Sequence, residues 1–375
     1  MVPKLRFKEF CGEWDEKSIE FLGTVVTGNT PSTNDSTNYG DEYMFVSPGD
    51  LGESKYINKT EKMLSKKGFN SCRKLEKGAI LVTCIGSTIG KIGIANHRMT
   101  TNQQINSIIV NDVYNNEFIY YSLIFNFPKY MNFIGKQAVP ILNKSQFEKL
   151  KLKCPSFSEQ TKIADFLSTV DDKIQNQQDK ITHLENIKKG FMQKIFSRKV
   201  RFKDDGGKGF SEWEEEKLGD ISYSISSGKS SKDLQGKYNL YGSTGIIGKT
   251  NNIECQGEFI LVARVGANAG KVNCINGIYG VSDNTIIIRN KEEIISKFLY
   301  YRLEFYNINR LVFGSGQPLV TSTDLKKIKI KIPSKKEQQK ITDFLSLFDE
   351  KISIEKEMLE DLKHLKKGLL QQMFV

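Results

Sequence analysis

Two long stretches of this chain of 375 residues repeat each other at a constant offset of 178 residues. Residues 150–175, LKLKCPSFSEQTKIADFLSTVDDKIQ, return at 328–353 as IKIKIPSKKEQQKITDFLSLFDEKIS. The match runs without a gap to KKGFMQKIFS (188–197) and KKGLLQQMFV (366–375), and about 21 of the 48 aligned residues are identical. An internal repeat of this size constrains the architecture more than any finer pattern does. It predicts the order globular unit, helix, globular unit, helix.

Each repeated stretch carries its own signal for the start of a helix. A proline ends a short strand, the serine after it can cap the helix N-terminus, and a glutamate three residues further completes a capping box. These residues are Pro155, Ser156 and Glu159 in the first copy and Pro333, Ser334 and Glu337 in the second. We therefore predict two long helices that begin at these serines.

Apolar residues follow each predicted helix start in alternating steps of four and three, which places them on one stripe of the helix. The stripe comprises Ile163, Leu167, Val170, Ile174, Ile181 and Leu184 in the first helix and Ile341, Leu345, Phe348, Ile352, Leu359 and Leu362 in the second. Polar residues interrupt both stripes at equivalent places, Gln177 with Glu355 and Lys188 with Lys366. Such a stripe is the seam along which two helices pack. Because polar residues in a seam fix the register of the two helices at a cost in stability, the matched interruptions predict that the helices pack together. A pseudo-two-fold axis would make the pair an antiparallel coiled coil. The alternative is two separate surface helices, each of which covers its own globular unit.

The globular units are rich in strand signals. The apolar runs AILVTCI (79–85) and FILVARV (259–265) have the length of buried strands, and each is closed by a glycine-bounded sequence, GSTIGK (86–91) or GANAGK (266–271). These sequences differ from a phosphate-binding Walker loop, because three residues rather than four separate the glycines and neither Ser nor Thr follows the lysine. They favour a turn between strands, in which glycine permits a positive φ.

These patterns together predict an α+β fold of two strand-rich domains that alternate with two long helices. The expected segments are a domain at 1–155, a helix at 156–198, a domain at 199–333 and a helix at 334–375. Other loops differ between the two domains, which predicts two heads that recognise different targets.

Composition restricts the partners and the chemistry. The net charge of +11, from 55 basic and 44 acidic residues, suits a polyanion, and nucleic acid more than a membrane. No run of about 18 apolar residues occurs, and the first residues, MVPKLRFKEF, lack the apolar core of a signal peptide, so we expect a cytoplasmic protein. Six cysteines lie singly and three histidines are scattered, so we expect no disulfide framework, no metal site and no catalytic residue set.

Characteristic sequences occur along nearly the whole chain: TGNTPS, VSPGDLG, AILVTCIGSTIGKIG, FILVARVGANAGKV, YGSTGIIG and the two P-S-x-x-E-Q-x-K-I-x-D-F-L helices. In this combination the chain resembles the specificity (S) subunit of type I restriction-modification systems. This resemblance implies two target-recognition domains, 1–155 and 199–333, that alternate with two helices forming an antiparallel coiled coil. The second head is short and has a different type of loop, so the loops of one head do not transfer to the other.

The resemblance also implies a function. Each head of a non-catalytic subunit would bind one half of an asymmetric bipartite target in double-stranded DNA, and the coiled coil would set the gap between the halves. Two modification subunits would supply methylation with S-adenosylmethionine, and restriction subunits would supply translocation and cleavage with ATP and Mg. This chain would bind no cofactor and no membrane. The alternative is a protein-binding scaffold with two recognition heads on a coiled-coil spacer. A solitary methyltransferase ranks third, since its signatures are missing.

Loop residues of these heads are the candidates for DNA contact. Lysine and arginine would contact phosphates, and polar side chains would read base edges. The candidates are Asn29, Thr30, Ser32, Lys91, Asn102, Gln103, Lys136 and Gln137 in the first head and Lys229, Ser230, Ser243, Thr244, Arg264, Asn268, Lys271, Asn284 and Gln317 in the second.

Overall fold

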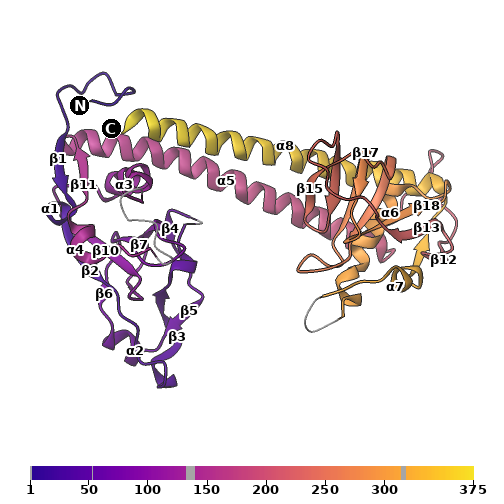
Figure 1. Cartoon of the computed structure of the whole chain (residues 1–375), viewed down its shortest axis with the longest axis horizontal. Coiled ribbons are helices and arrows are strands. Elements are labelled where there is room, and N and C mark those ends of the chain that lie inside the picture. Colours follow the sequence, from indigo (N-terminus) through magenta and orange to yellow (C-terminus); the bar gives the residue numbers. More distant parts are fainter. Residues whose placement is uncertain (1, 53, 132–139, 314–317) are drawn as a thin grey trace. The chain divides into compact units, whose positions relative to one another are not determined.

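The chain forms two compact units in a computed structural model. The structure describes residues 2–52, 54–131, 140–313 and 318–375. Unit 1 comprises Met1–Gln178 and Glu357–Val375, and unit 2 comprises Asp179–Lys356. Each unit contains one strand-rich head and a part of each of two long helices, α5 (Phe157–Phe196) and α8 (Lys335–Met373) (Figure 1). The predicted α+β fold and its order of head, helix, head, helix are confirmed.

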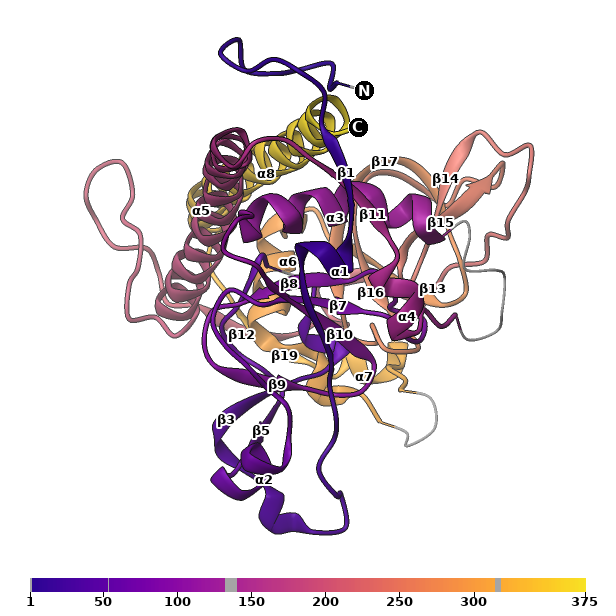
Figure 2. The same cartoon turned by 90° about the vertical axis from the view of Figure 1, so that its left-hand side faces the viewer.

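The described residues of the unit 1 head form three sheets and several helices. Its elements are β1 (Asp15–Ser18), α1 (Ile19–Leu22), β2 (Gly23–Thr27), η1 (Ser36–Asn38), β3 (Tyr39–Val46), η2 (Pro48–Asp50), β4 (Tyr56–Ile57), β5 (Lys62–Leu64), α2 (Lys66–Ser71), β6 (Lys74–Leu75), β7 (Ile80–Thr83), β8 (Ile92–Ala95), β9 (Met99–Thr101), β10 (Ile105–Val110), α3 (Asn116–Met131), α4 (Lys144–Glu148) and β11 (Lys151–Cys154). The sheets have the orders β2-β10-β7-β8-β4, β5-β3-β9-β6 and β1-β11. Every residue of β7 is buried, as its continuous apolar run predicts, and α3 packs against the five-stranded sheet (Figure 2).

The head of unit 2 is simpler, with two sheets in the part that the structure describes. Its elements are β12 (Glu214–Lys217), β13 (Ser222–Ser227), β14 (Tyr238–Gly242), β15 (Gly245–Thr250), β16 (Cys255–Ala263), β17 (Val272–Val281), β18 (Thr285–Asn290), α6 (Ser296–Tyr306), η3 (Ile308–Leu311), α7 (Ser322–Lys326) and β19 (Lys329–Ile332). A six-stranded sheet has the order β13-β18-β16-β17-β14-β15, and β12 pairs with β19. The pair β12-β19 corresponds to β1-β11, since each joins the strand that enters a head to the strand that leaves it.

The two glycine-bounded sequences are the same hairpin turn in the two heads. Antiparallel strands β7 and β8 are joined by one of them, and β16 and β17 by the other. The closing glycines, Gly90 and Gly270, have φ of 90° and 85°, and both donate a hydrogen bond back across the hairpin, to Thr83 O (2.9 Å) and Ala263 O (2.8 Å). The prediction of a turn between strands is therefore confirmed.

The repeated Pro-Ser-x-x-Glu-Gln sequence attaches the start of each long helix to its own head. Ser156 Oγ accepts a hydrogen bond from Glu159 N (3.4 Å), which is the serine half of the predicted capping box. The buried Glu159 carboxylate binds the Arg6 guanidinium through two hydrogen bonds, at 2.7 and 2.8 Å. Gln160 accepts a hydrogen bond from Asn115 N (3.0 Å), just before α3. Unit 2 repeats these contacts with Ser334, Glu337, Arg201, Gln338 and Ile295.

Inside each unit, α5 and α8 lie side by side and run antiparallel. The lysines that interrupt the apolar stripes each pair with an aspartate of the other helix: Lys366 Nζ lies 2.6 Å from Asp171 Oδ1, and Lys188 Nζ lies 2.7 Å from Asp349 Oδ1. Of the twelve predicted seam residues, nine are buried, while Ile174, Phe348 and Leu362 are partly buried. Among the described residues, no helix, α5 and α8 included, combines the length and the apolar character needed to span a membrane.

The C-terminal end of each long helix forms part of the core of a head. In unit 1, Leu370, Met373 and Phe374 of the α8 end pack with the core of the first head. In unit 2, the end of α5 contributes Met192, Ile195 and Phe196 to the core of the second head. Both long helices therefore contribute to the core of each head: the start of the helix that follows it and the end of the other.

Candidate nucleic-acid interface

Two candidate residues of the first head meet where β2 ends and β10 begins. Gly28 N donates to Ile105 O (3.0 Å), and a Cβ at Gly28 would lie 2.2 Å from Asn102 O, so the two chain segments are in close contact. We call this contact the edge of the first head. Here Thr30 Oγ1 donates to Gln103 Oε1 at 2.6 Å. Thr30 and Gln103 are both exposed, so this pair presents polar atoms to a ligand.

Two other candidates of the first head use their amides inside the head. Asn29 donates from Nδ2 to Ser71 O (3.2 Å) and accepts at Oδ1 from Arg73 N (2.8 Å). Asn102 likewise donates to Gln104 Oε1 (3.0 Å) and accepts from Gln104 N (3.1 Å). These two amides hold the loops that carry the exposed residues.

The remaining candidates of the first head are spread over other loops. Ser32 is exposed, and the stem of Lys91 lies partly buried beside Gly52, whose added Cβ would be 3.3 Å from Lys91 Cγ. Lys136 and Gln137 lie outside the described residues.

Three candidates of the second head converge at the corresponding place, where β14 and β16 end and β18 begins. We call this place the edge of the second head. Arg264 N donates to Asn284 O (2.9 Å), and Ser243 Oγ donates to the same oxygen (2.5 Å). Arg264 Nη1 donates to Asp283 O at 3.3 Å. Since a guanidinium has five N–H donors, Arg264 keeps donors beyond this contact for a ligand.

The other candidates of the second head differ in accessibility. Ser230 is buried and bonds Asn252 O (3.2 Å), so its side chain supports the fold. Asn268 and Lys271 line a cleft of about 360 Å³ beside α6, together with Tyr300 and Glu304. Lys229 and Thr244 are exposed, and Gln317 lies outside the described residues.

The two edges share a backbone scaffold and differ in side chains. Cys84 N donates to Gln104 O (2.8 Å) in the first head as Arg264 N does to Asn284 O in the second, and both partners are displaced by 180 residues. Burial raises the pKa of the Cys84 thiol to about 12, so the first head has an uncharged, buried side chain at this position. In the other head it carries a partly exposed cation.

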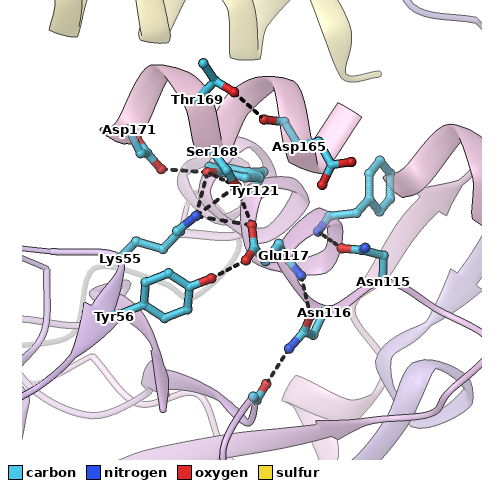
Figure 3. Close-up of polar contacts among 12 residues, drawn as sticks. Lys55, Tyr56, Asn115, Asn116, Glu117, Tyr121, Asp165, Ser168, Thr169 and Asp171 are labelled. Atoms are coloured by element: carbon cyan, nitrogen blue, oxygen red, sulfur yellow. Dashed lines mark hydrogen bonds and ion pairs between the residues drawn. The ribbon is translucent and has the colours of Figure 1, made fainter. Parts of the chain in front are cut away.

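A polar network that no sequence pattern predicts joins the first head to α5 (Figure 3). Lys55, whose side chain is 8% exposed, lies 3.1 Å from Glu117 Oε2 and donates to Ser168 Oγ at 2.8 Å. Tyr56 and Ser168 also donate to the Glu117 carboxylate. Tyr121 donates to Asp171 of α5 at 2.6 Å. The network fixes the loop before β4 against the helix.

Opposing effects act on the ionisation of Glu117 in this network. Burial opposes the charged form, but the hydrogen bonds from Ser168 and Tyr56 and the charge of Lys55 outweigh it and lower the pKa of Glu117. No sequence motif connects Lys55, Glu117 and Ser168, because they come from three separate elements.

No group of three or more His, Cys, Asp or Glu residues that could hold a metal ion occurs among the described residues. The arrangement instead provides polar and cationic side chains on the loops of two differing heads, each held against a helix pair. Such an arrangement defines a two-headed protein that arose by internal duplication.

Comparison with known proteins assigns the family. The type I restriction modification DNA specificity domain matches residues 12–186 and again 210–364. Because these two matches cover most of the chain, the protein belongs to this family.

Individual relatives agree with the family. The chain is 32% identical over 223 residues to the type I restriction enzyme MjaIX specificity subunit of Methanocaldococcus jannaschii, with 56% of this chain and 51% of the relative covered. It is 25% identical to the MjaVIII specificity subunit of the same organism, with 97% and 94% covered. The chain thus spans about half the length of the first relative, and its match to the HindI specificity subunit of Haemophilus influenzae covers 32% of that protein.

A solved structure has the same fold. The chain matches the type I restriction-modification S subunit from M. genitalium with a TM-score of 0.62 at 20% identity, covering 100% of this chain and 99% of the other.

Proposed function

We propose that this chain is the DNA sequence-specificity subunit of a type I restriction-modification complex in the cytoplasm. Each head, residues 1–155 and 199–333, binds one half of an asymmetric bipartite target in double-stranded DNA. The chain also serves as the platform on which two modification subunits and the restriction subunits dock. It is itself non-catalytic, and its partners bind S-adenosylmethionine, ATP and Mg.

The observation that carries this proposal is the pair of matching edges with different side chains. Thr30 and Gln103 occupy the edge of one head, and Ser243, Arg264 and Asn284 occupy the edge of the other. Polar side chains and arginine are the groups that read base edges, and the same scaffold with different groups suits two different half-sites. The net charge of +11 supplies the attraction to phosphates.

The long helices have the role of a spacer in this proposal. Helices 156–198 and 334–375 form an antiparallel coiled coil that sets the unread gap between the half-sites. Buried seam residues and the lysine–aspartate pairs between α5 and α8 support this role. The alternative function, a protein-binding scaffold, would use the same spacer without DNA.

The decisive experiment maps methylated adenines in cells with and without this gene. A bipartite motif that loses methylation when the gene is deleted supports the proposal, and an unchanged methylome contradicts it. Exchanging residues 1–155 for the first head of another family member should change one half-site, and a change in both would contradict independent heads.

Binding and turnover provide a second test. The complex with its modification subunits should bind the mapped target with an affinity that falls steeply with salt, because phosphate contacts release counterions. Salt-independent binding to a protein instead of DNA would favour the scaffold. The chain purified alone should neither methylate nor cleave DNA.

A further inference from the structure

The loop between β13 and β14, residues 228–237, is held in a fixed path on the second head. At its start, Ser230 N donates to Val281 O (2.9 Å). Further along, Asp233 N donates to Lys249 O (2.9 Å), at the end of β15. At its end, a Cβ on Gly236 would lie 2.3 Å from Thr250 N, so the backbone of the loop packs directly on β15. The loop is therefore anchored before and after its tip.

The tip of this loop is a tight turn that presents Leu234 to solvent. Gly236 N donates to Asp233 O (3.0 Å), which closes a β-turn with Leu234 and Gln235 at its centre. Asp233 Oδ1 reinforces the turn by accepting from Gln235 N at 2.9 Å. Leu234 has a relative exposure of 105%, the highest of any large apolar residue that the structure describes. The fold itself gains no burial from this side chain.

Exposed lysines lie on this loop and on the strand against which it packs. Lys232 lies on the loop with its stem over Gly248, where a Cβ would be 3.4 Å from Lys232 Cγ. Lys229 and Lys237 lie near the loop ends, and Lys249 lies on the adjoining β15. No ion pair of these four lysines is formed with any residue in the described parts of the chain. The carboxylate of Asp233 is engaged by the turn and by Asn251 Nδ2 (2.7 Å).

We propose that Leu234 is an apolar wedge that inserts into DNA at the second half-site, between base pairs or in the minor groove. The neighbouring lysines contact the flanking phosphates. Proteins that unstack a base step use an apolar side chain on a rigid element in this way, with cations that neutralise the backbone on either side. This inference rests on the proposed function and adds a residue that positions and deforms the target.

The position of the loop favours DNA over a lipid surface. The loop starts at Gly228, whose N donates to Thr285 O (3.0 Å). Thr285 follows Asn284, which lies at the edge of the second head. A single leucine at the tip also provides one insertion point and no continuous apolar face for a bilayer. The equivalent loop of the first head, residues 28–38, contains neither leucine nor lysine, so the wedge acts at one half-site only.

The test uses the complex of this chain with its modification subunits and duplexes that carry the mapped target. 2-Aminopurine is placed at successive positions in and beside the half-site assigned to the second head. We expect the fluorescence of one position to rise on binding, and the rise to disappear with Leu234→Ala. This variant should bind the duplex roughly 10-fold more weakly, with an unchanged salt slope, which is the slope of log affinity against log salt concentration. Lys232→Gln should keep the fluorescence rise and reduce the salt slope by about one.

Controls separate this inference from the proposed function. Ile278→Ala removes another exposed apolar side chain of the same head, 46% exposed on β17, and should change neither affinity nor fluorescence. Wild-type affinity and wild-type fluorescence in Leu234→Ala would overturn the wedge while leaving the specificity role intact. Loss of binding to anionic phosphatidylglycerol vesicles in Leu234→Ala, with DNA binding unchanged, would also overturn it. If the wild-type complex binds no target at all, the proposed function fails and the wedge fails with it.

Discussion

At the scale of single residues, the two units keep the contacts that hold the fold and change those around them. Tyr121 and Tyr301 each donate a hydrogen bond to an aspartate of a long helix, Asp171 or Asp349. Burial, together with these aspartates, raises the pKa of both tyrosines, so both hydroxyls remain protonated donors. The residue four positions before Tyr121 is Glu117, which binds Lys55, whereas the matching residue in unit 2 is a lysine. The first head therefore has an additional attachment to its helix.

The charge of Glu117 should stabilise unit 1 in a pH-dependent way. Its pKa is lower in the folded chain, so this stability is fully present above the ordinary glutamate pKa of about 4.3 and is lost as pH falls through the folded value. Glu117→Gln should cost roughly 2 kcal/mol at pH 7, because Lys55 loses its charged partner. Denaturant titrations near pH 7 and at pH about 3.5 check this. The difference in the free energy of unfolding between Glu117→Gln and wild type should shrink at the lower pH. The control variant Glu61→Gln, at an exposed residue, should change the free energy of unfolding little at either pH. An equal difference at both values would contradict the charge-based account.

At the scale of elements, the long helices are structural parts of the heads in addition to their proposed role as a spacer. Phe374, near the C-terminus, packs edge-on against Trp14 (ring centroids 6.1 Å apart) in the core of the first head. Phe196, which lies 178 residues earlier, packs against Trp213 (6.4 Å) in the core of the second. The repeat at the end of each helix is thus explained by the core that it completes.

This matched pair of phenylalanines makes an internal control for a stability prediction. Phe374→Ala should destabilise unit 1 by about 3–5 kcal/mol, the usual cost of removing a buried phenylalanine, and Phe196→Ala should do the same to unit 2. Hydrogen exchange measured by mass spectrometry resolves the two units. We expect faster exchange in β7 and β10 for the first variant and in β16 and β18 for the second. The same exchange pattern in both variants would contradict the assignment of the α8 end to the core of the first head and of the α5 end to the core of the second.

At the scale of the whole molecule, the duplication produces two units with equivalent attachments and different loops. The pairs Lys366–Asp171 and Lys188–Asp349 use residues at the same places in the two helices. Since both helices contribute to both units, a change in length of one helix alone would put these pairs out of register.

An insertion in both helices therefore tests the proposed spacer. Seven residues added after Gln178 and after Lys356, which are equivalent positions, keep the seam in phase and lengthen each helix by about 10 Å. The unread gap of the DNA target should grow by roughly three base pairs, measured by mapping methylated adenines in cells that express the variant. Insertion into one helix only should abolish methylation. An unchanged gap after the double insertion would remove the spacer from the proposed function.

Patterns in the amino-acid sequence are enough to predict the order of domains, the two long helices, their seam and the glycine turns. These features depend on local rules: a helix start needs a cap within a few residues, a seam needs a regular spacing, and a hairpin turn needs glycine where φ is positive. Repetition strengthened each signal, because the same pattern at 150–197 and 328–375 excludes coincidence.

Tertiary packing, in contrast, controls which candidate side chains remain available and which residues meet. Asn29 and Ser230 look like recognition residues in the sequence, yet their polar groups bond neighbouring loops. Lys55 meets Glu117 across 62 residues and Ser168 across 113, distances in sequence that no local pattern spans. The exposure of Leu234 likewise follows from a turn fixed by Lys249 and Thr250. Spacing along the chain determines which element a residue joins, whereas its partners depend on how distant segments pack.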